Sequence, residues 1–138
     1  MNEQEMRALF FERLEHLDAQ AEYELRHPDY VMEMPQSGER IRGRDNMRAF
    51  QEAYPKFSTP PTAQPRRVVG AGDVWVVEGQ ADYGGRIFHV ANIVEFRDGK
   101  IWRETRYYAD PFEAPAWRAQ WTERMEEAAA PGASTPSA

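Results

Sequence analysis

Apolar positions near the N-terminus repeat with helical spacing. The i, i+3, i+4, i+7 pattern of an amphipathic helix extends over residues 3–17, at Met6, Leu9, Phe10, Leu14 and Leu17. A second, shorter helix is predicted over residues 19–27, because the residue before Pro28 is pushed out of helical backbone space. We therefore expect two helices at the start of the fold.

The pattern then changes to the alternation typical of a strand. Residues 30–34 (YVMEM) alternate and are rich in strand-forming types, so they predict a strand that Pro35 ends. Pro28 and Asp29 are expected to form the turn before it.

A polar, glycine-containing stretch follows. Residues 36–38 (QSG) predict a turn, and Asp45 is the expected N-cap of a helix over residues 47–54. A phosphate-binding loop would need a Gly-rich segment that runs into a helix with Lys-Ser or Lys-Thr, and this chain has neither. We expect the alternating arginines of the stretch to share one solvated face: Arg40, Arg42 and Arg44.

The second half of the chain predicts strands. After an expected loop over residues 57–64, four runs rich in β-formers cover residues 66–70, 72–83, 85–98 and 100–110. Gly84-Gly85 and Asp98-Gly99 are dipeptides typical of hairpin turns, so the runs predict an antiparallel meander. Residues 116–130 could form a closing helix. We expect one domain over residues 1–127 and a disordered tail over residues 128–138.

Composition narrows the classes of function. The chain has 138 residues and a net charge of −6, so it lacks the basic field that nucleic acids or anionic membranes attract. It contains no cysteine, which excludes disulfides, thiolate nucleophiles and cysteine-type zinc sites. No stretch approaches the length of a membrane span and the N-terminus does not read as a signal peptide. We expect a cytoplasmic protein that binds neither nucleic acid nor membranes.

The order of the predicted elements resembles the nuclear transport factor 2-like superfamily and, within it, the SnoaL-like proteins. Three stretches carry the resemblance: HPDYVMEMPQSG (27–38), IRGRDNMRAF (41–50) and IVEFRDGKIWRETRYYADPF (93–112). The resemblance implies an α+β fold in which a curved antiparallel sheet wraps on N-terminal helices to form a cone with an internal pocket. It also implies a small organic ligand and a homodimer that forms through the sheet.

Two enzymes that share this fold allow a comparison at single positions. The resemblance to ketosteroid isomerase places its carboxylate base at Met34, its oxyanion acid at Val94 and its tyrosine near Phe10, so all three catalytic groups are replaced. The resemblance to limonene-epoxide hydrolase places its Arg-x-Asp on Gln80 and Asp82 and its second Asp on Arg106. Only Asp82 matches, although Glu104 could supply a second acid.

The catalytic candidates are Asp82, Glu104 and Arg106. Alternation places Trp102, Glu104, Arg106 and Tyr108 on one strand face, and the resemblance implies that this face lines the concave side with the stripe from Phe88 to Phe96, interrupted by Asn92, and with Glu78, Gln80 and Asp82. The alternative is that Arg106 with Asp82 or Glu104 is a structural ion pair that fixes strand register. Asn92, likewise, could bond to neighbouring backbone instead of a ligand.

The candidates for ligand contact are Asn92, Tyr108, Trp102, Tyr54, Met34 and His27. His27 could lie at the edge of the pocket or serve only as a turn residue that bonds to backbone. The three histidines lack metal-ligand spacing, so no metal is expected and no cofactor is implied.

Three hypotheses about function remain open. The first is a cofactor-independent cyclase, isomerase or hydrolase that acts on an apolar organic substrate by general acid–base catalysis. The second is a non-catalytic ligand-binding or homodimerisation module, in which the same charges form pairs. The third is a domain that recruits a partner through an apolar convex face around Trp75, Val77 and Tyr83.

Overall fold

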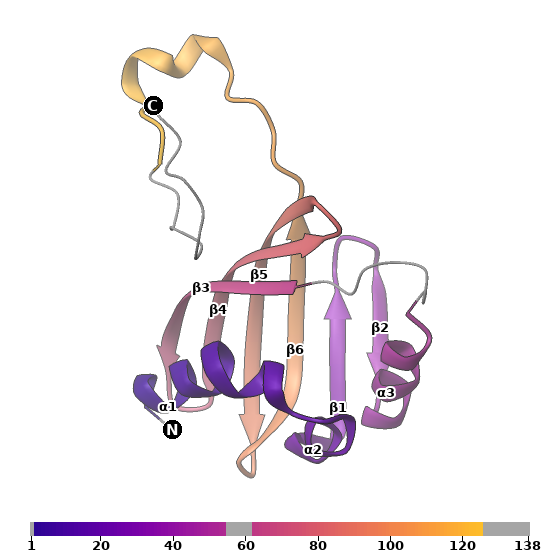
Figure 1. The fold of residues 1–138 in the computed structure, drawn as a ribbon. Coiled ribbons are helices and arrows are strands. Elements are labelled where there is room, and N and C mark those ends of the chain that lie inside the picture. Colours follow the sequence, from indigo (N-terminus) through magenta and orange to yellow (C-terminus); the bar gives the residue numbers. More distant parts are fainter. Residues whose placement is uncertain (1, 55–61, 126–138) are drawn as a thin grey trace.

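A six-stranded curved sheet with helices across one face forms the fold (Figure 1). The structure, a computed structural model, describes residues 2–54 and 62–125. The helices are α1 (Glu3–Ala8), η1 (Leu9–Arg13), η2 (Leu14–His16), α2 (Ala19–Leu25), α3 (Arg44–Glu52) and η3 (Ala116–Trp121). The strands are β1 (Arg26–Met34), β2 (Glu39–Arg42), β3 (Thr62–Ala71), β4 (Val74–Tyr83), β5 (Arg86–Arg97) and β6 (Lys100–Ala109).

The strand order confirms the α+β class. Neighbouring strands follow the order β2-β1-β6-β5-β4-β3, and the predicted meander from β3 to β6 is antiparallel throughout. The sheet is nevertheless mixed, because β1 pairs with β6 in parallel. That pairing joins the first strand to the last and brings residues of β1 beside residues of β6 that follow about 70 positions later.

The N-terminal helical segment covers the sheet. The predicted helix is helical over residues 3–16, but its hydrogen-bond pattern changes from α to π to 3₁₀ along its length. Asn2 caps it with a reciprocal bond to Glu5. Met6 and Leu9 are buried and pack against a core cluster under the helix: Tyr30, Met32, Met47, Val68, Trp75, Val94, Phe96 and Ile101. We call this surface of the sheet the helix-covered face.

The predicted turn at Pro28 and Asp29 is wrong, because β1 already begins at Arg26. The ladder with β6 is irregular between Arg26 and Val31, and this gap accommodates a proline that has no N–H to donate. The Nδ1 atom of His27 accepts a hydrogen bond from the backbone N–H of Asp29 at 2.9 Å. The strand therefore tolerates a dipeptide that the sequence pattern assigns to a turn.

The polar stretch after β1 forms a hairpin and then a helix. The four residues of β2 pair with β1, a strand that the polar sequence ERIR did not indicate. The N-cap of α3 is Gly43, at φ 89°, and not Asp45. Asp45 lies in the first turn of α3 and accepts a bond from the Tyr23 hydroxyl at 2.8 Å.

Arg44 does not share the solvated face expected for the three arginines of this stretch, whereas Arg40 and Arg42 are both exposed in β2. Arg40 pairs with Glu33 at 2.7 Å across the hairpin. Arg44 donates to the Arg26 carbonyl at 3.1 Å and lies 4.3 Å from the centre of the Tyr23 ring. The stretch is therefore scaffold that links a hairpin to a helix.

The curvature of β3 depends on a glycine in β4. Thr62, Ala63 and Gln64, expected in a loop, belong to β3, which bends across the other strands in Figure 1. Gly79 pairs with Pro65, where the register of β3 and β4 shifts. A Cβ atom at Gly79 would lie 2.3 Å from the backbone oxygen of Gln64, so only glycine allows this close crossing.

The C-terminal part differs from the expected long helix. A 3₁₀ helix covers only Ala116–Trp121, and residues 122–125 are not helical. The rest of the expected helix and the tail over residues 128–138 lie outside the described residues. No helix in residues 2–54 and 62–125 is long and apolar enough to cross a membrane.

Candidate functional site

The register between β4 and β5 decides which side chains share the helix-covered face. Trp75 pairs with the buried Val94, and Val77 pairs with Asn92. Directly paired residues point to the same side of a sheet, so alternate residues of β4 from Trp75 to Tyr83 lie on the helix-covered face. The expectation that Trp75, Val77 and Tyr83 form a convex apolar face is therefore wrong.

The same register removes Asp82 from the site. Glu78, Gln80 and Asp82 lie on the opposite face, so the expected convergence of Asp82 with Glu104 and Arg106 does not occur. The Asp82 carboxylate accepts a bond from the backbone N–H of Gly85 at 2.6 Å, within the β4–β5 turn. Its position suits a turn residue.

A β-bulge also removes Trp102. Glu95 pairs with Arg103 and Phe96 pairs with Ile101, so Trp102 is an extra residue in β6. The bulge reverses the alternation, and the indole lies 3.8 Å from the guanidinium carbon of Arg97 and 5.0 Å from that of Arg103, measured to its ring centre. Trp102 is thus on the face opposite to Glu104, in contrast to the prediction.

Glu104 is the centre of a buried polar network. Its Oε1 accepts a bond from the Tyr30 hydroxyl at 3.0 Å, and its Oε2 accepts one from Asn92 Nδ2 at 3.0 Å. Arg106 adds Nε at 2.7 Å and Nη2 at 2.6 Å, both to Oε2. The carboxylate is 4% exposed and has four donors. We call these four residues the Glu104 network: Tyr30, Asn92, Glu104 and Arg106.

The network fixes the charge states of its members. Burial by itself raises the pKa of Glu104, but the Arg106 guanidinium and the bonds from Arg106 and Asn92 outweigh it and lower the pKa below 4.5. Burial lowers the pKa of Arg106, and the Glu104 carboxylate more than reverses this. Burial and the Glu104 charge raise the pKa of Tyr30 well above its usual range. Glu104 and Arg106 are therefore a buried ion pair, and Tyr30 is a neutral donor.

Two groups in the network keep unused hydrogen-bonding capacity. The Oδ1 atom of Asn92 is buried and has no partner among the described residues. The Nδ2 atom of the same amide faces the acceptor Glu104, which fixes the orientation of the amide. The side chain of Arg106 is 24% exposed, so the ion pair is open to solvent on one side.

The strands continue from this network to an open end. Tyr83, Arg86, Phe88 and Tyr108 line a hollow of about 440 Å³ there. Tyr83 packs edge-to-face on Phe88, with ring centres 5.3 Å apart, and lies 6.4 Å from the Tyr108 ring. Burial, the neighbouring Tyr108 hydroxyl and the proximity of Tyr54 raise the pKa of Tyr83 to about 12. Tyr83 is therefore protonated at neutral pH and can donate a hydrogen bond.

The other predicted ligand contacts have separate locations. His27 lies in β1, where its Nδ1 accepts a bond from the backbone N–H of Asp29 and its Nε2 lies 3.3 Å from Asp98 in the β5–β6 turn. It therefore bonds to backbone as the alternative interpretation expected, but it does so in a strand and not in a turn. Met34 is partly buried and packs against the core cluster. Tyr54 lies close enough to Tyr83 to affect its pKa, and Tyr108 lies in the hollow. No cluster of possible metal ligands occurs within residues 2–54 and 62–125.

Sequence reasoning missed Tyr30 and Tyr83. Tyr30 and the core residue Met32 are two positions apart in β1 and so lie on the same strand face. This spacing could have placed the Tyr30 side chain on the helix-covered face. Tyr83 was assigned to the wrong face together with the rest of β4. Arg86, at the rim of the hollow, follows a hairpin turn and gives no signal of its own in the sequence.

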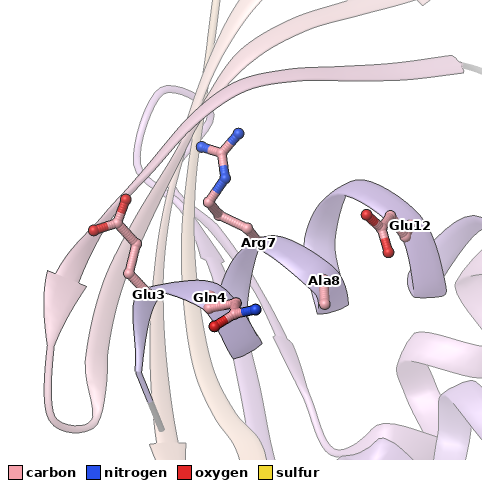
Figure 2. A pocket seen from close by; sticks show the side chains of 5 residues that line it. All are labelled: Glu3, Gln4, Arg7, Ala8 and Glu12. Carbon is pink, nitrogen blue, oxygen red and sulfur yellow. The ribbon is translucent and has the colours of Figure 1, made fainter.

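A second hollow lies along the N-terminal helical segment and has a volume of about 530 Å³. Figure 2 shows its side chains spread along the segment without converging on one point. The guanidinium of Arg7 lies 4.6 Å from the centre of the Phe11 ring. This hollow brings no set of reactive groups together, unlike the Glu104 network and the open end beside it.

Comparison with known proteins adds a family and several similar structures. The model of the SnoaL-like domain family matches residues 8–104. An NTF-2 like protein of unknown function from Burkholderia xenovorans LB400 has 41% sequence identity and a TM-score of 0.68, over 78% of this chain and 83% of that chain.

Two further structures carry isomerase names. A putative ketosteroid isomerase from Kribbella flavida DSM 17836 has 26% identity and a TM-score of 0.71, over 90% of this chain and 92% of that chain. A putative isomerase from Bacillus subtilis has 28% identity and a TM-score of 0.58, over 78% of this chain and 89% of that chain. The search of curated proteins found no match.

Proposed function

The chain belongs to the SnoaL-like domain family, and we propose from this that it binds a small, mainly apolar organic molecule that carries a hydroxyl and a carbonyl oxygen. The observation that supports this most directly is the buried Oδ1 atom of Asn92, which has no partner among the described residues. An acceptor buried without a partner is costly, and a ligand that donates to it removes the cost.

Arg106 supplies the complementary group. Asn92 and Arg106 are paired directly across β5 and β6, so their Cβ atoms lie about 5 Å apart on one face. A ligand hydroxyl would donate to Asn92 Oδ1 while a neighbouring carbonyl oxygen accepts from the guanidinium of Arg106. The apolar body of the ligand would rest on the rings of Tyr83, Phe88 and Tyr108 in the hollow.

Catalysis by proton transfer is less well supported. At the level of the family, the two similar structures that carry isomerase names support small-molecule binding or isomerisation. Isomerisation needs a base, and Glu104 is the one buried carboxylate among the described residues. Its oxygens already accept bonds from three side chains and its pKa is lowered, so it is a poor base. Binding without turnover is therefore the proposed function.

A thermal-shift screen tests the proposal. The purified protein is melted with hydroxyketones, steroids, terpenoids and aromatic polyketide-like compounds, and each compound is recovered afterwards. A ligand at 100 times its Kd should add about 2.7 kcal/mol to the free energy of unfolding. We expect Asn92→Ala to abolish this gain, and the control Asn46→Ala to keep it, since Asn46 only bonds to the Arg42 carbonyl.

Three outcomes would contradict the proposal. One is that no compound class raises the melting temperature of the unmodified protein. Another is that Asn92→Ala keeps the full gain, which would place the ligand elsewhere. The third is the recovery of a chemically changed compound, which would replace binding by catalysis.

A further inference from the structure

An aromatic arm leaves the body of the protein after β6. It comprises residues 110–125 and includes η3, and Figure 1 shows it beyond the end of the sheet. Three of its aromatic side chains face solvent: Phe112 is 80% exposed, Trp117 74% and Trp121 73%. Large apolar side chains that lie together on a surface mark a site of interaction.

The arm is fixed at its root and unsupported beyond it. Arg86 bonds to Asp110 at 3.0 Å, and Gln36 bonds to the backbone of Tyr108. Beyond Asp110, the hydrogen bonds of the described part of the arm are internal, such as the one from Thr122 to the Arg118 carbonyl at 3.2 Å. No bond or ion pair links residues 111–125 to the other described residues. The rest of the chain therefore provides no hydrogen bond or ion pair that fixes the part of the arm that carries the aromatic rings.

The root of the arm lies at the rim of the hollow at the open end. Arg86 and Tyr108 line that hollow and also hold the root. Pro111 and Pro115 restrict the backbone between root and rings, and Pro115 is extended at φ −63° and ψ 138°. The helix η3, which includes Trp117 and Trp121, follows this segment and lies away from the sheet in Figure 1.

We propose that the arm of one copy packs its aromatic rings over the hollow of a second copy, and that the exchange is reciprocal. A two-fold axis that brings one arm to the partner's hollow also brings the partner's arm to the first hollow. The hollow, with a volume of about 440 Å³, has aromatic walls, so the partner's rings can pack over it and over a ligand bound in it.

The area involved is that of a stable dimer. Aromatic side chains bury roughly 150–250 Å² each, so two arms of three rings, with the surfaces that receive them, remove on the order of 2,000 Å² from water. Stable interfaces bury about 1,200–2,000 Å². The exchanged arm would also cover the open side of the Glu104 network, so each site would be completed by the other copy. The exchange itself needs no ligand, and the ligand proposed above would lie in the hollow beneath the partner's rings.

Cross-linking tests it, since the chain has no cysteine of its own. Trp117→Cys and Phe88→Cys are made in separate chains, mixed, and treated with a short bismaleimide. We expect a covalent dimer in the mixture, and none when the exposed Phe50→Cys replaces Trp117→Cys as the matched control. A cross-link that forms only within single chains carrying both substitutions would show that the arm folds back on its own body and would overturn the proposal.

The mass in solution provides a second test that avoids any change in the hollow. Sedimentation of the full chain should give a dimer. The double substitution Trp117→Ser with Trp121→Ser should raise the Kd of the dimer at least tenfold and so favour the monomer. The circular dichroism of the variant should be unchanged, because no hydrogen bond or ion pair links residues 111–125 to the other described residues. A dimer of unchanged stability in the double variant would contradict the exchange.

Discussion

The helix-covered face of the sheet has two ends that are built differently from the same three strands. At the closed end, Trp75, Val94, Phe96 and Ile101 pack under Met6 and Leu9 and are at most 4% exposed. At the open end, Tyr83, Phe88 and Tyr108 surround a hollow that no described helix covers. The Glu104 network lies between these two ends.

This difference shows where one sheet can serve both stability and binding. Helical cover turns the closed end into core, where each side chain contributes by excluding water. Without a helix of its own chain over it, the open end keeps aromatic and polar groups available for a ligand or a partner. The Glu104 network lies at the boundary between the closed end and the open end. On the side of the core, the Glu104 carboxylate is buried and neutralised by Arg106, and on the side of the open end the Arg106 side chain is partly exposed.

The largest expected effect comes from breaking the network. Arg106→Ala leaves the Glu104 carboxylate buried without its cation, so it should reduce the free energy of unfolding by about 3–5 kcal/mol in urea denaturation. The double substitution Glu104→Leu with Arg106→Met removes both charges and should cost much less. If the single and double variants lose equal stability, the ion pair does not separate the two ends.

A matched pair of valines in β5 tests the comparison itself. Val94 and Val90 point to the same face, but Val94 is fully buried at the closed end and Val90 is only partly buried near the open end. At about 0.8 kcal/mol per methylene plus a cavity term, Val94→Ala should cost roughly 2–3 kcal/mol. Val90→Ala should cost about half of that. Equal losses in thermal or urea unfolding would mean that the two ends are packed alike.

The dependence of stability on pH should give a smaller effect that has a definite sign. The pKa of Glu104 is lowered in the folded protein, so its stabilising contribution is present above its unfolded value of about 4.5 and is lost as the pH falls through the folded value. The difference in unfolding free energy between the unmodified protein and Glu104→Gln should therefore shrink below pH 4.5.

Glu33 provides the control for this titration. The bond from Arg40 also lowers its pKa, but the pair is exposed and screened by solvent. Glu33→Gln should change stability little at any pH. A larger pH-dependent loss for Glu33→Gln than for Glu104→Gln would contradict the assignment of the buried charge.

The sequence predicted most of the elements in their order, although it did not indicate β2. The helical spacing around Met6 and Leu9 and the dipeptide Asp98-Gly99 predicted a helix and a hairpin that the structure contains. These signals are local, because they depend on periodicity and turn chemistry within a few residues. The stretches that carry the family resemblance are also short segments of sequence, and they predicted the fold class.

The site depended on signals that are not local. Both faces of β4 are apolar from Val74 to Val77, so alternation could not decide which face is covered, and Asp82 was placed on the wrong one. The alternation of side chains in the sequence of β6 does not indicate that Trp102 is an extra residue at a β-bulge. The bond between Tyr30 and Glu104 spans 74 positions and needs the parallel pairing of β1 with β6. Predicting these features needs the register of the sheet.

Side-chain NMR during a ligand titration tests the central claim most directly. The Arg106 Nε–H and Asn92 amide signals report on the open side of the network, and the Trp75 indole N–H, bonded to the Gly72 carbonyl at 2.9 Å, reports on the closed end. Binding at the open end predicts that the Arg106 and Asn92 signals shift in proportion to occupancy while the Trp75 signal stays in place. A shift of the Trp75 signal with unchanged Arg106 and Asn92 signals would contradict it.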